Sequence, residues 1–125
     1  MASNSLILFI ASLMLFSLQC NGQQCTGSDI AVNLVKTGSV VEGDPEYEVT
    51  VSNNCEKCTA VNVHVQCFGL NSVEPVNKTA IRPEAGTDRC IVNDGKPISQ
   101  GSPVKFKYAW LTPQDFPVVS YEFKC

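Results

Sequence analysis

Cysteine is the residue type whose number and spacing most clearly point to chemistry in this 125-residue chain. One of the seven cysteines, Cys20, lies at the end of an apolar leader, so an even set remains in the rest of the chain. An even number of cysteines in a small secreted domain predicts a disulfide framework, here of three bonds. The cysteines of this framework are Cys25, Cys55, Cys58, Cys67, Cys90 and Cys125.

The Cys55-x-x-Cys58 spacing also occurs in zinc sites and in redox-active pairs. A zinc site needs further ligands, and no second C-x-x-C or H-x-x-x-H motif follows at a zinc-finger distance. A redox pair is activated beside a helix N-terminus, whereas the residues around this pair alternate in the manner of strands. We therefore predict disulfides at these positions, and no metal or cofactor.

Strand geometry limits the partners of Cys67. If residues 61–67 form one strand at roughly 3.3 Å per residue, Cys67 lies about 20 Å from the turn that carries Cys55 and Cys58. A disulfide requires Cα atoms within about 7 Å of each other. Cys67 should therefore pair with Cys25, Cys90 or Cys125, and Cys90 is the partner we favour.

Side chains that could catalyse a reaction are few. His64 is the single histidine, and we expect it to be solvated on the polar face of a strand. Asp44, Glu46 and Glu48 form an acidic run, and paired carboxylates can hydrolyse glycosides, but such a site needs a long cleft. We interpret the run as a solvated face or as part of a binding surface. With no glycine-rich phosphate loop and no G-x-S-x-G motif, the sequence predicts no enzyme.

Alternation of apolar and polar residues predicts strands through most of the chain. We expect the strands around 47–51 and 61–67 to pair as an antiparallel hairpin whose loop, 53–60, holds the Cys55-x-x-Cys58 pair. Further strands are expected at 30–35, 79–82, 90–93, 104–110 and 119–125. About seven short strands without helical periodicity predict an all-β fold, a small antiparallel β-sandwich stapled by three disulfides.

The N-terminal apolar run, Leu6 to Leu18, is shorter than the roughly 20 residues that span a bilayer. It suits a secretory signal with cleavage after Gly22. We therefore expect residues 1–22 to be a signal peptide and residues 23–125 to be a single secreted, extracellular, monomeric domain. The formal net charge is -3, without a basic cluster, so binding to nucleic acid or to an anionic membrane is not expected.

Two surface features are also predicted. Asn77-Lys78-Thr79 is an N-glycosylation acceptor, which requires an exposed loop or edge. The aromatic residues of the last two strands are expected in the core, with Trp110, at a strand end, as the exception. These aromatic residues are Phe106, Tyr108, Trp110, Tyr121 and Phe123.

Five short motifs, in order, resemble the plant tapetum determinant family of small, secreted, cysteine-rich proteins. The resemblance covers the chain from Cys25 onward and is closest to the short members of the family, because no dibasic processing site is present. Leu70 follows Gly69 where Phe is expected. The motifs are Asp44-Pro45 to Val51, Asn53-Asn54-Cys55-x-x-Cys58, the Val-rich strand to Cys67 with Gly69 two residues on, Cys90-Ile91-Val92-Asn93-x-Gly95-x-Pro97-Ile98, and Val104-x-Phe106-x-Tyr108-Ala109-Trp110 before the closing Cys125.

The resemblance implies a signalling ligand of the plant apoplast. Its partner would be the extracellular domain of a leucine-rich-repeat receptor kinase, and its role would be cell fate specification in reproductive or other tissue. We expect loops and the acidic run to contact the receptor. The candidate residues are Asp44, Glu46, Glu48, Glu56, Lys57, Trp110, Gln114 and Asp115.

Two other functions compete with this interpretation. The chain could be a cell-wall or carbohydrate-binding module without catalysis, in which Trp110 and Tyr121 would be exposed and would stack on sugar rings. It could also be a carrier that binds lipid between its two sheets.

Overall fold

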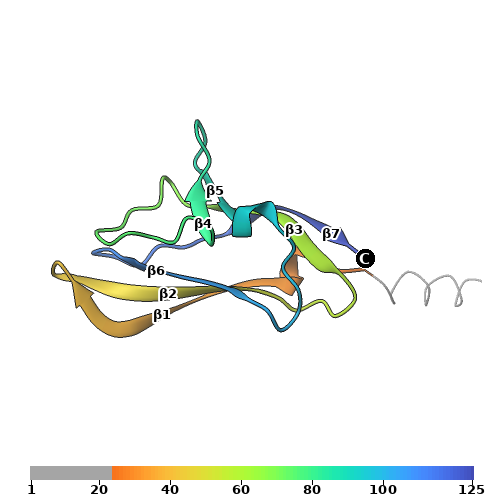
Figure 1. The fold of residues 1–125 in the computed structure, drawn as a ribbon, viewed down its shortest axis with the longest axis horizontal. Helices are drawn as coiled ribbons and strands as arrows, with labels where there is room; N and C mark the ends of the chain where they lie inside the picture. The colour runs from red at the N-terminus through yellow and green to blue at the C-terminus, as the bar shows by residue number, and fades with distance from the viewer. Residues whose placement is uncertain (1–23) are drawn as a thin grey trace, which may run out of the picture.

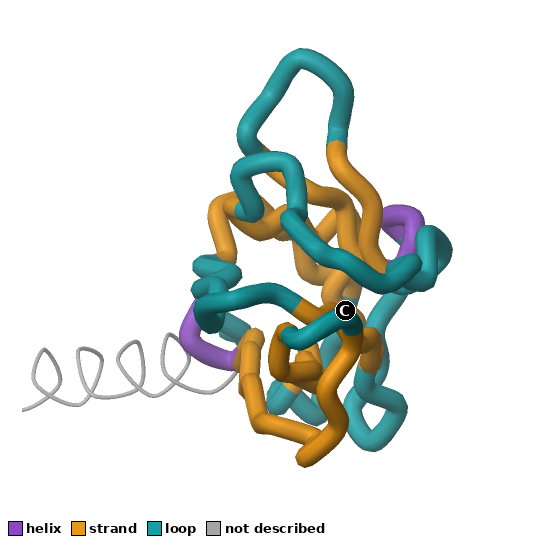
Figure 2. Tube along the Cα trace, turned by 90° about the vertical axis from the view of Figure 1, so that its left-hand side faces the viewer, coloured by secondary structure: helices purple, strands orange, loops and turns teal. Residues whose placement is uncertain are grey.

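The computed structural model describes residues 24–125. The predicted signal peptide, residues 1–22, lies outside the described residues, so its cleavage stays a prediction. Seven strands form two antiparallel sheets that are stacked as layers (Figure 1). Helix in the described part is confined to two short 3₁₀ turns (Figure 2). The predicted all-β sandwich is therefore confirmed.

The described residues form two short 3₁₀ turns and two sheets of unequal size. No helix within residues 24–125 is long and apolar enough to cross a membrane. The 3₁₀ turns are η1 (Gly27–Asp29) and η2 (Asn93–Gly95). The first sheet has the order β1 (Ile30–Val41), β2 (Asp44–Asn53), β6 (Val104–Ala109), and the second has the order β4 (Ile81–Pro83), β5 (Arg89–Val92), β3 (Thr59–Gln66), β7 (Val118–Lys124).

Alternating side chains fill the space between the layers. Tyr47, Val49 and Val51 of β2 are buried, and the residues between them are only half-buried. Val63 and Val65 of β3 are fully buried in the second sheet. Removing this apolar surface from water is the main term that stabilises a sandwich of this size.

The first strand is longer than the sequence predicts. β1 continues past an irregularity in its pairing with β2, between Lys36 and Val40, and ends at Val41. The reversal into β2 takes place at Glu42 and Gly43, whose φ angles of 50° and 88° are left-handed. The turn therefore follows a strand that ends six residues beyond residue 35, the end of the predicted strand.

The segment between β2 and β3 crosses from one sheet to the other, and this corrects the predicted hairpin. β2 pairs with β1 and β6, whereas β3 pairs with β5 and β7. The prediction was wrong because an alternating strand has the same pattern whether its neighbour in the chain pairs with it or packs across the core. We call residues 54–58 the crossover.

Asn53 holds the crossover in place. Its side chain is 2% exposed, and its Nδ2 donates hydrogen bonds to the carbonyl oxygens of Cys58 (2.8 Å) and Ile98 (3.0 Å). Its Oδ1 accepts a hydrogen bond from the Cys55 N–H (2.9 Å). Ile98 also exchanges two backbone hydrogen bonds with Ala60. One buried amide thus joins the end of β2, the start of β3 and the segment before β6, with its polar atoms satisfied.

Disulfides reinforce the same region. The sulfurs of Cys25, Cys55 and Cys58 lie within 4.8 Å of one another at the crossover. They belong to disulfides, so none of them is a free thiolate that could bind a metal. The bond of Cys67 is to Cys90, the favoured partner, with Cα atoms 5.8 Å apart. The three bonds are Cys25–Cys55, Cys58–Cys125 and Cys67–Cys90.

We expect Asn53→Ala to destabilise the protein by about 3 kcal/mol, because two buried carbonyl groups and one N–H lose a hydrogen-bond partner. Urea unfolding of the oxidised protein measures this loss. Asn54→Ala is the matched control, since Asn54 is exposed and only its backbone N–H is bonded, to the Asp29 carbonyl. Equal midpoints for the two variants would show that the Asn53 amide does not hold the crossover.

Candidate functional site

The segment that connects β6 to β7, residues 110–117, is the centre of the candidate site, and we call it the connecting loop. It is anchored in the core by Phe116, which is 4% exposed and meets the rings of Phe106 and Tyr108 edge-on. The N–H of Gln114 donates to the hydroxyl of Tyr108 (2.8 Å), and its Nε2 donates to the Asn71 carbonyl (2.7 Å). These contacts give the loop a defined shape.

Burial also changes the pKa of the Tyr108 hydroxyl, which helps to anchor this loop. The pKa of the Tyr108 hydroxyl is raised, mainly by desolvation, and its hydrogen bond with Gln114 opposes this effect in part. The hydroxyl therefore stays neutral at physiological pH. In that state it accepts the Gln114 N–H without placing a charge in the core.

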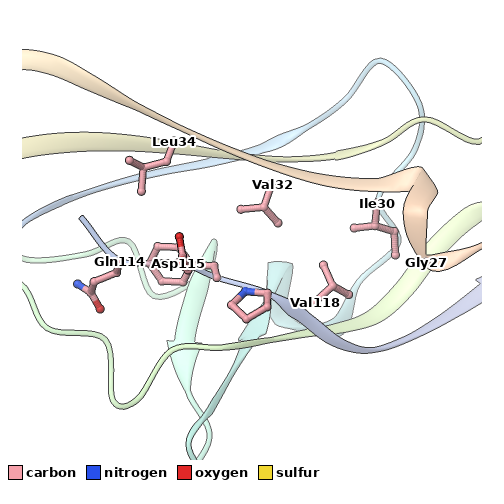
Figure 3. Close-up of a pocket in the computed structure, with 9 residues that line it drawn as sticks. Gly27, Ile30, Val32, Leu34, Gln114, Asp115 and Val118 are labelled. Atoms are coloured by element: carbon pink, nitrogen blue, oxygen red, sulfur yellow. The ribbon is translucent and has the colours of Figure 1, made fainter. Parts of the chain in front are cut away.

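An apolar cleft lies on one side of the connecting loop, where the edges of the two sheets separate. Ile30, Val32 and Leu34 of β1 and Val118 of β7 point into it (Figure 3). The cleft has a volume of about 520 Å³. Its full lining is Gly27, Ile30, Val32, Leu34, Gln114, Asp115, Phe116, Pro117 and Val118.

A second hollow, which we call the aromatic groove, lies on the other side of the loop. Its volume is about 430 Å³, and Phe68 and Trp110 both line it. Phe68 is 68% exposed and Leu111, next to Trp110, is 72% exposed. Exposed large apolar side chains beside a hollow are a feature that contact surfaces share. The full lining is Gln66, Cys67, Phe68, Asn71, Trp110, Thr112, Gln114, Asp115 and Pro117.

The backbone that presents Phe68 is strained. Phe68, Gly69 and Leu70 have φ angles of 48°, 86° and 56°, and a left-handed conformation costs a non-glycine residue about 1–2 kcal/mol. The N–H groups of Cys67 and Phe68 both donate to the Asp88 carbonyl, each at 2.9 Å, and Leu70 N–H donates to the Cys67 carbonyl. The Cys67–Cys90 bond fixes the same point. Surrounding structure therefore holds Phe68 outward.

The acidic run lies on the outer face of the first sheet. Glu46 and Glu48 alternate with buried residues of β2 and face Lys107 of the neighbouring strand, which is in register with Glu48. Glu46 accepts a hydrogen bond from the Thr37 hydroxyl (2.7 Å). Glu74 joins this face from the loop after β3, and its Oε1 is shielded from solvent without a hydrogen-bond partner in the described chain.

The carboxyl groups of Glu46 and Glu74 alter each other's pKa. The pKa of Glu74 is raised, first by burial and then by its hydrogen bond with Glu46. The pKa of Glu46 is lowered, first by the hydrogen bond from Thr37 and then by that from Glu74. Of the two carboxyl groups, that of Glu74 therefore takes up a proton first as the pH falls.

The structure brings some of the predicted contact residues together and separates others. Trp110, Gln114 and Asp115 line the aromatic groove. Asp44, Glu46 and Glu48 lie on β2 near the same end, where Trp110 N–H donates to the Pro45 carbonyl. Two further residues lie at the opposite end of β2, exposed in the crossover, so the eight candidates do not form one surface. These are Glu56 and Lys57.

Phe68 and Leu111 were missed, although each carried a signal. Phe68 stands between a framework cysteine and a glycine, where a strand cannot continue, and Leu111 lies between Trp110 and the proline-marked end of the loop. Apolar residues at such turns have no strand face to join. Their position outside the alternating pattern therefore indicates exposure.

Two other sequence expectations need correction. His64 is half-buried rather than solvated, because Glu84 of the β4–β5 connection reaches its Nε2 (2.8 Å) while its Nδ1 contacts the Asn62 carbonyl (3.0 Å). Tyr121 is 40% exposed rather than in the core, because β7 is an edge strand. Its ring packs on Phe123 and over Gly27, away from the aromatic groove that Trp110 lines.

Asn77 is exposed in the loop before β4, as glycosylation requires. Its Oδ1 accepts hydrogen bonds from the N–H (3.0 Å) and the hydroxyl (2.7 Å) of Thr79. Asn77 lines a shallow hollow together with Glu46 and Glu74. A glycan on Asn77 would therefore start beside the acidic face.

We expect Glu74→Gln to be more stable than the parent protein at pH 7, since glutamine donates to Glu46 but cannot ionise. Because folding raises the pKa of Glu74, the protonated carboxyl stabilises the protein. This stabilisation is complete below the ordinary value of 4.5 and is lost as pH rises through the folded pKa. The gain should therefore vanish below about pH 4.5. Thermal unfolding between pH 3.5 and 8 tests this, with Glu48→Gln as control. A gain that persists in acid would show that ionisation of Glu74 is not its cause.

Comparisons with known proteins identify the relatives of the chain. Residues 26–125 match the family model described as "Tapetum determinant 1, C-terminal". The chain is 36% identical over 89 residues to TPD1 protein homolog 1 of Arabidopsis thaliana, which covers 70% of this chain and 49% of that protein. It is 35% identical over 92 residues to TPD1 protein homolog 1A of Oryza sativa subsp. japonica, which covers 67% of this chain and 40% of that protein.

A third relative has a similar length. An uncharacterized protein of Arabidopsis thaliana is 28% identical over 118 residues, which cover 92% of this chain and 91% of that protein. The chain spans about half the length of the Arabidopsis homolog named above, and less of the rice homolog. No solved structure matches the chain. The match of the family model to nearly all of the described residues shows that this chain belongs to the tapetum determinant 1 family.

Proposed function

We propose that this protein is a secreted signalling ligand that binds the extracellular domain of a leucine-rich-repeat receptor kinase in plants and acts in cell fate specification. The observation that carries the proposal is the family match over residues 26–125. Secretion into the apoplast agrees with three disulfides, which persist in oxidising compartments. The proposal involves no catalysis and no cofactor.

The fold supports a role as a ligand. Three disulfides and the core contacts of Phe116 hold both sheets and the connecting loop before any partner arrives. A pre-organised surface loses little conformational entropy on binding, so more of its contact energy appears as affinity. A single small domain can also fit the concave face of a repeat solenoid as a monomer.

The surface near the connecting loop supports the same role. Phe68 and Leu111 are exposed and Trp110 is half-buried beside them. Aromatic side chains of this kind dominate the energy of protein interfaces. The acidic face with Glu46 and Glu48 lies at the same end, where it would increase the rate of encounter with a basic receptor surface.

Binding to receptor ectodomains tests the proposal. The full-length chain, expressed in plant cells, should be recovered from the medium with Gln23 at its N-terminus. We expect saturable binding to one member of a panel of leucine-rich-repeat ectodomains, and loss of binding after reduction, which removes the framework. If protein with three intact disulfides and a cooperative unfolding transition binds no ectodomain, the ligand role is wrong. A polysaccharide pull-down would then test the carbohydrate-binding alternative.

We also expect the secreted protein to carry a glycan on Asn77. Mass spectrometry should show a heterogeneous added mass that Thr79→Ala abolishes, since the acceptor motif needs the hydroxyl residue. Ser72→Ala serves as a control in the same loop outside the motif. A single unmodified mass for the parent protein would refute this assignment.

A further inference from the structure

The aromatic groove contains one charged side chain, and that side chain is an acid. Among its nine lining residues Asp115 alone is charged, and no lysine, arginine or histidine is present. Asp115 is exposed, and no hydrogen bond or ion pair to its carboxylate is found within residues 24–125. The groove therefore presents a carboxylate that the domain itself does not neutralise.

A second carboxylate adjoins the groove. Asp88 accepts a hydrogen bond from Nε2 of Gln66 (3.0 Å), and Gln66 lines the groove. The Asp88 carbonyl is also the group that holds Cys67 and Phe68 in position. Two carboxylates at the groove favour a cation as its occupant.

Aromatic rings favour the same kind of occupant. Phe68 and Trp110 line the groove beside Asp115, and the face of an aromatic ring, above all that of tryptophan, attracts a cation. A guanidinium group satisfies both features at once, because it stacks on rings and forms paired hydrogen bonds with a carboxylate.

The strained backbone adds an independent observation. The left-handed Phe68 exposes 68% of a side chain that the core does not use. Strain of this kind persists where surrounding structure enforces it, and it concentrates at functional sites. The conformation keeps the Phe68 ring exposed in the lining of the groove.

We propose that the aromatic groove binds a basic side chain, arginine or lysine, of the partner protein, with Asp115 as its counter-ion and Phe68 and Trp110 as its aromatic contacts. The partner is the receptor ectodomain of the proposed function, on which this inference rests. The volume of about 430 Å³ accommodates such a side chain together with part of its neighbour.

The chemistry of the groove can be measured without a receptor, because Trp110 is the only tryptophan. Its indole N–H signal in a ¹⁵N spectrum reports on this groove alone. N-acetyl-arginine amide is the probe, and N-acetyl-citrulline amide, which has nearly the same shape without the charge, is the control. We expect the indole signal to shift saturably with the arginine probe and to remain unchanged with citrulline.

Variants identify the counter-ion. Asp115→Asn should lower the affinity for the arginine probe about fivefold or more. Glu122→Gln, which removes an exposed acid of β7 that is outside the groove lining, should leave the affinity unchanged. Equal shifts with arginine and citrulline, or an undiminished shift in Asp115→Asn, would overturn the proposal.

The second test measures the affinity for the receptor ectodomain identified in the panel experiment. We expect Phe68→Asn to lose about tenfold or more in affinity, since asparagine accepts the left-handed backbone but removes the ring. Val40→Ala is the matched control, because Val40 is also 68% exposed. Thermal unfolding confirms that both variants fold.

The outcomes separate the two proposals. If the parent protein and Phe68→Asn bind the receptor equally, the groove is not the interface, while the ligand role stands. If no ectodomain binds the parent protein, the ligand role fails, and the arginine titration alone decides whether the groove recognises a basic side chain.

Discussion

The buried amide of Asn53 determines where the chain leaves one sheet and enters the other, and the remaining connections follow from that point. Because β2 and β3 belong to different sheets, the chain must return to the first sheet before β6 and leave it again before β7. The return passes Ile98, which the same amide contacts. The last crossing is the connecting loop, at the opposite end of the sandwich (Figure 1). The proposed binding surface is thus a product of the topology, since a hairpin at residues 45–67 would need no such loop.

The two crossings are stabilised in different ways. At the crossover, polar groups are satisfied by one buried amide and the chain is closed by two disulfides. At the connecting loop, the ring of Phe116 is buried among aromatic neighbours and the Tyr108 hydroxyl accepts the Gln114 N–H. Phe116 separates the apolar cleft from the core, and the residues on either side of it remain at the surface. A loop anchored in this way can carry polar and aromatic contacts without rearranging on binding.

Local patterns in the sequence were sufficient to predict which segments form strands, but not which strands pair with each other. Alternation at Tyr47, Val49 and Val51 identifies a strand and its buried face, yet the bond from Asn53 to Ile98 joins residues 45 positions apart, which no local pattern reveals. The prolines of the connecting loop marked Gln114 and Asp115 as surface residues. The position of Phe68 outside the alternating pattern indicates its exposure, but its left-handed backbone could not be predicted, because it depends on Asp88 and on the Cys67–Cys90 bond. Likewise, the interaction of Glu46 with Glu74 depends on a loop that the alternation of β2 does not describe.

Two of the disulfides have a consequence for how the domain can be joined to other chains. Cys25–Cys55 and Cys58–Cys125 attach both ends of the described chain to the crossover. The crossover and the aromatic groove lie at opposite poles of β2, since Trp110 bonds to Pro45 and Asn53 ends the strand. Any polypeptide that extends from either end therefore leaves from the pole opposite the aromatic groove. The domain can be displayed, tethered or paired through its ends while the groove stays accessible.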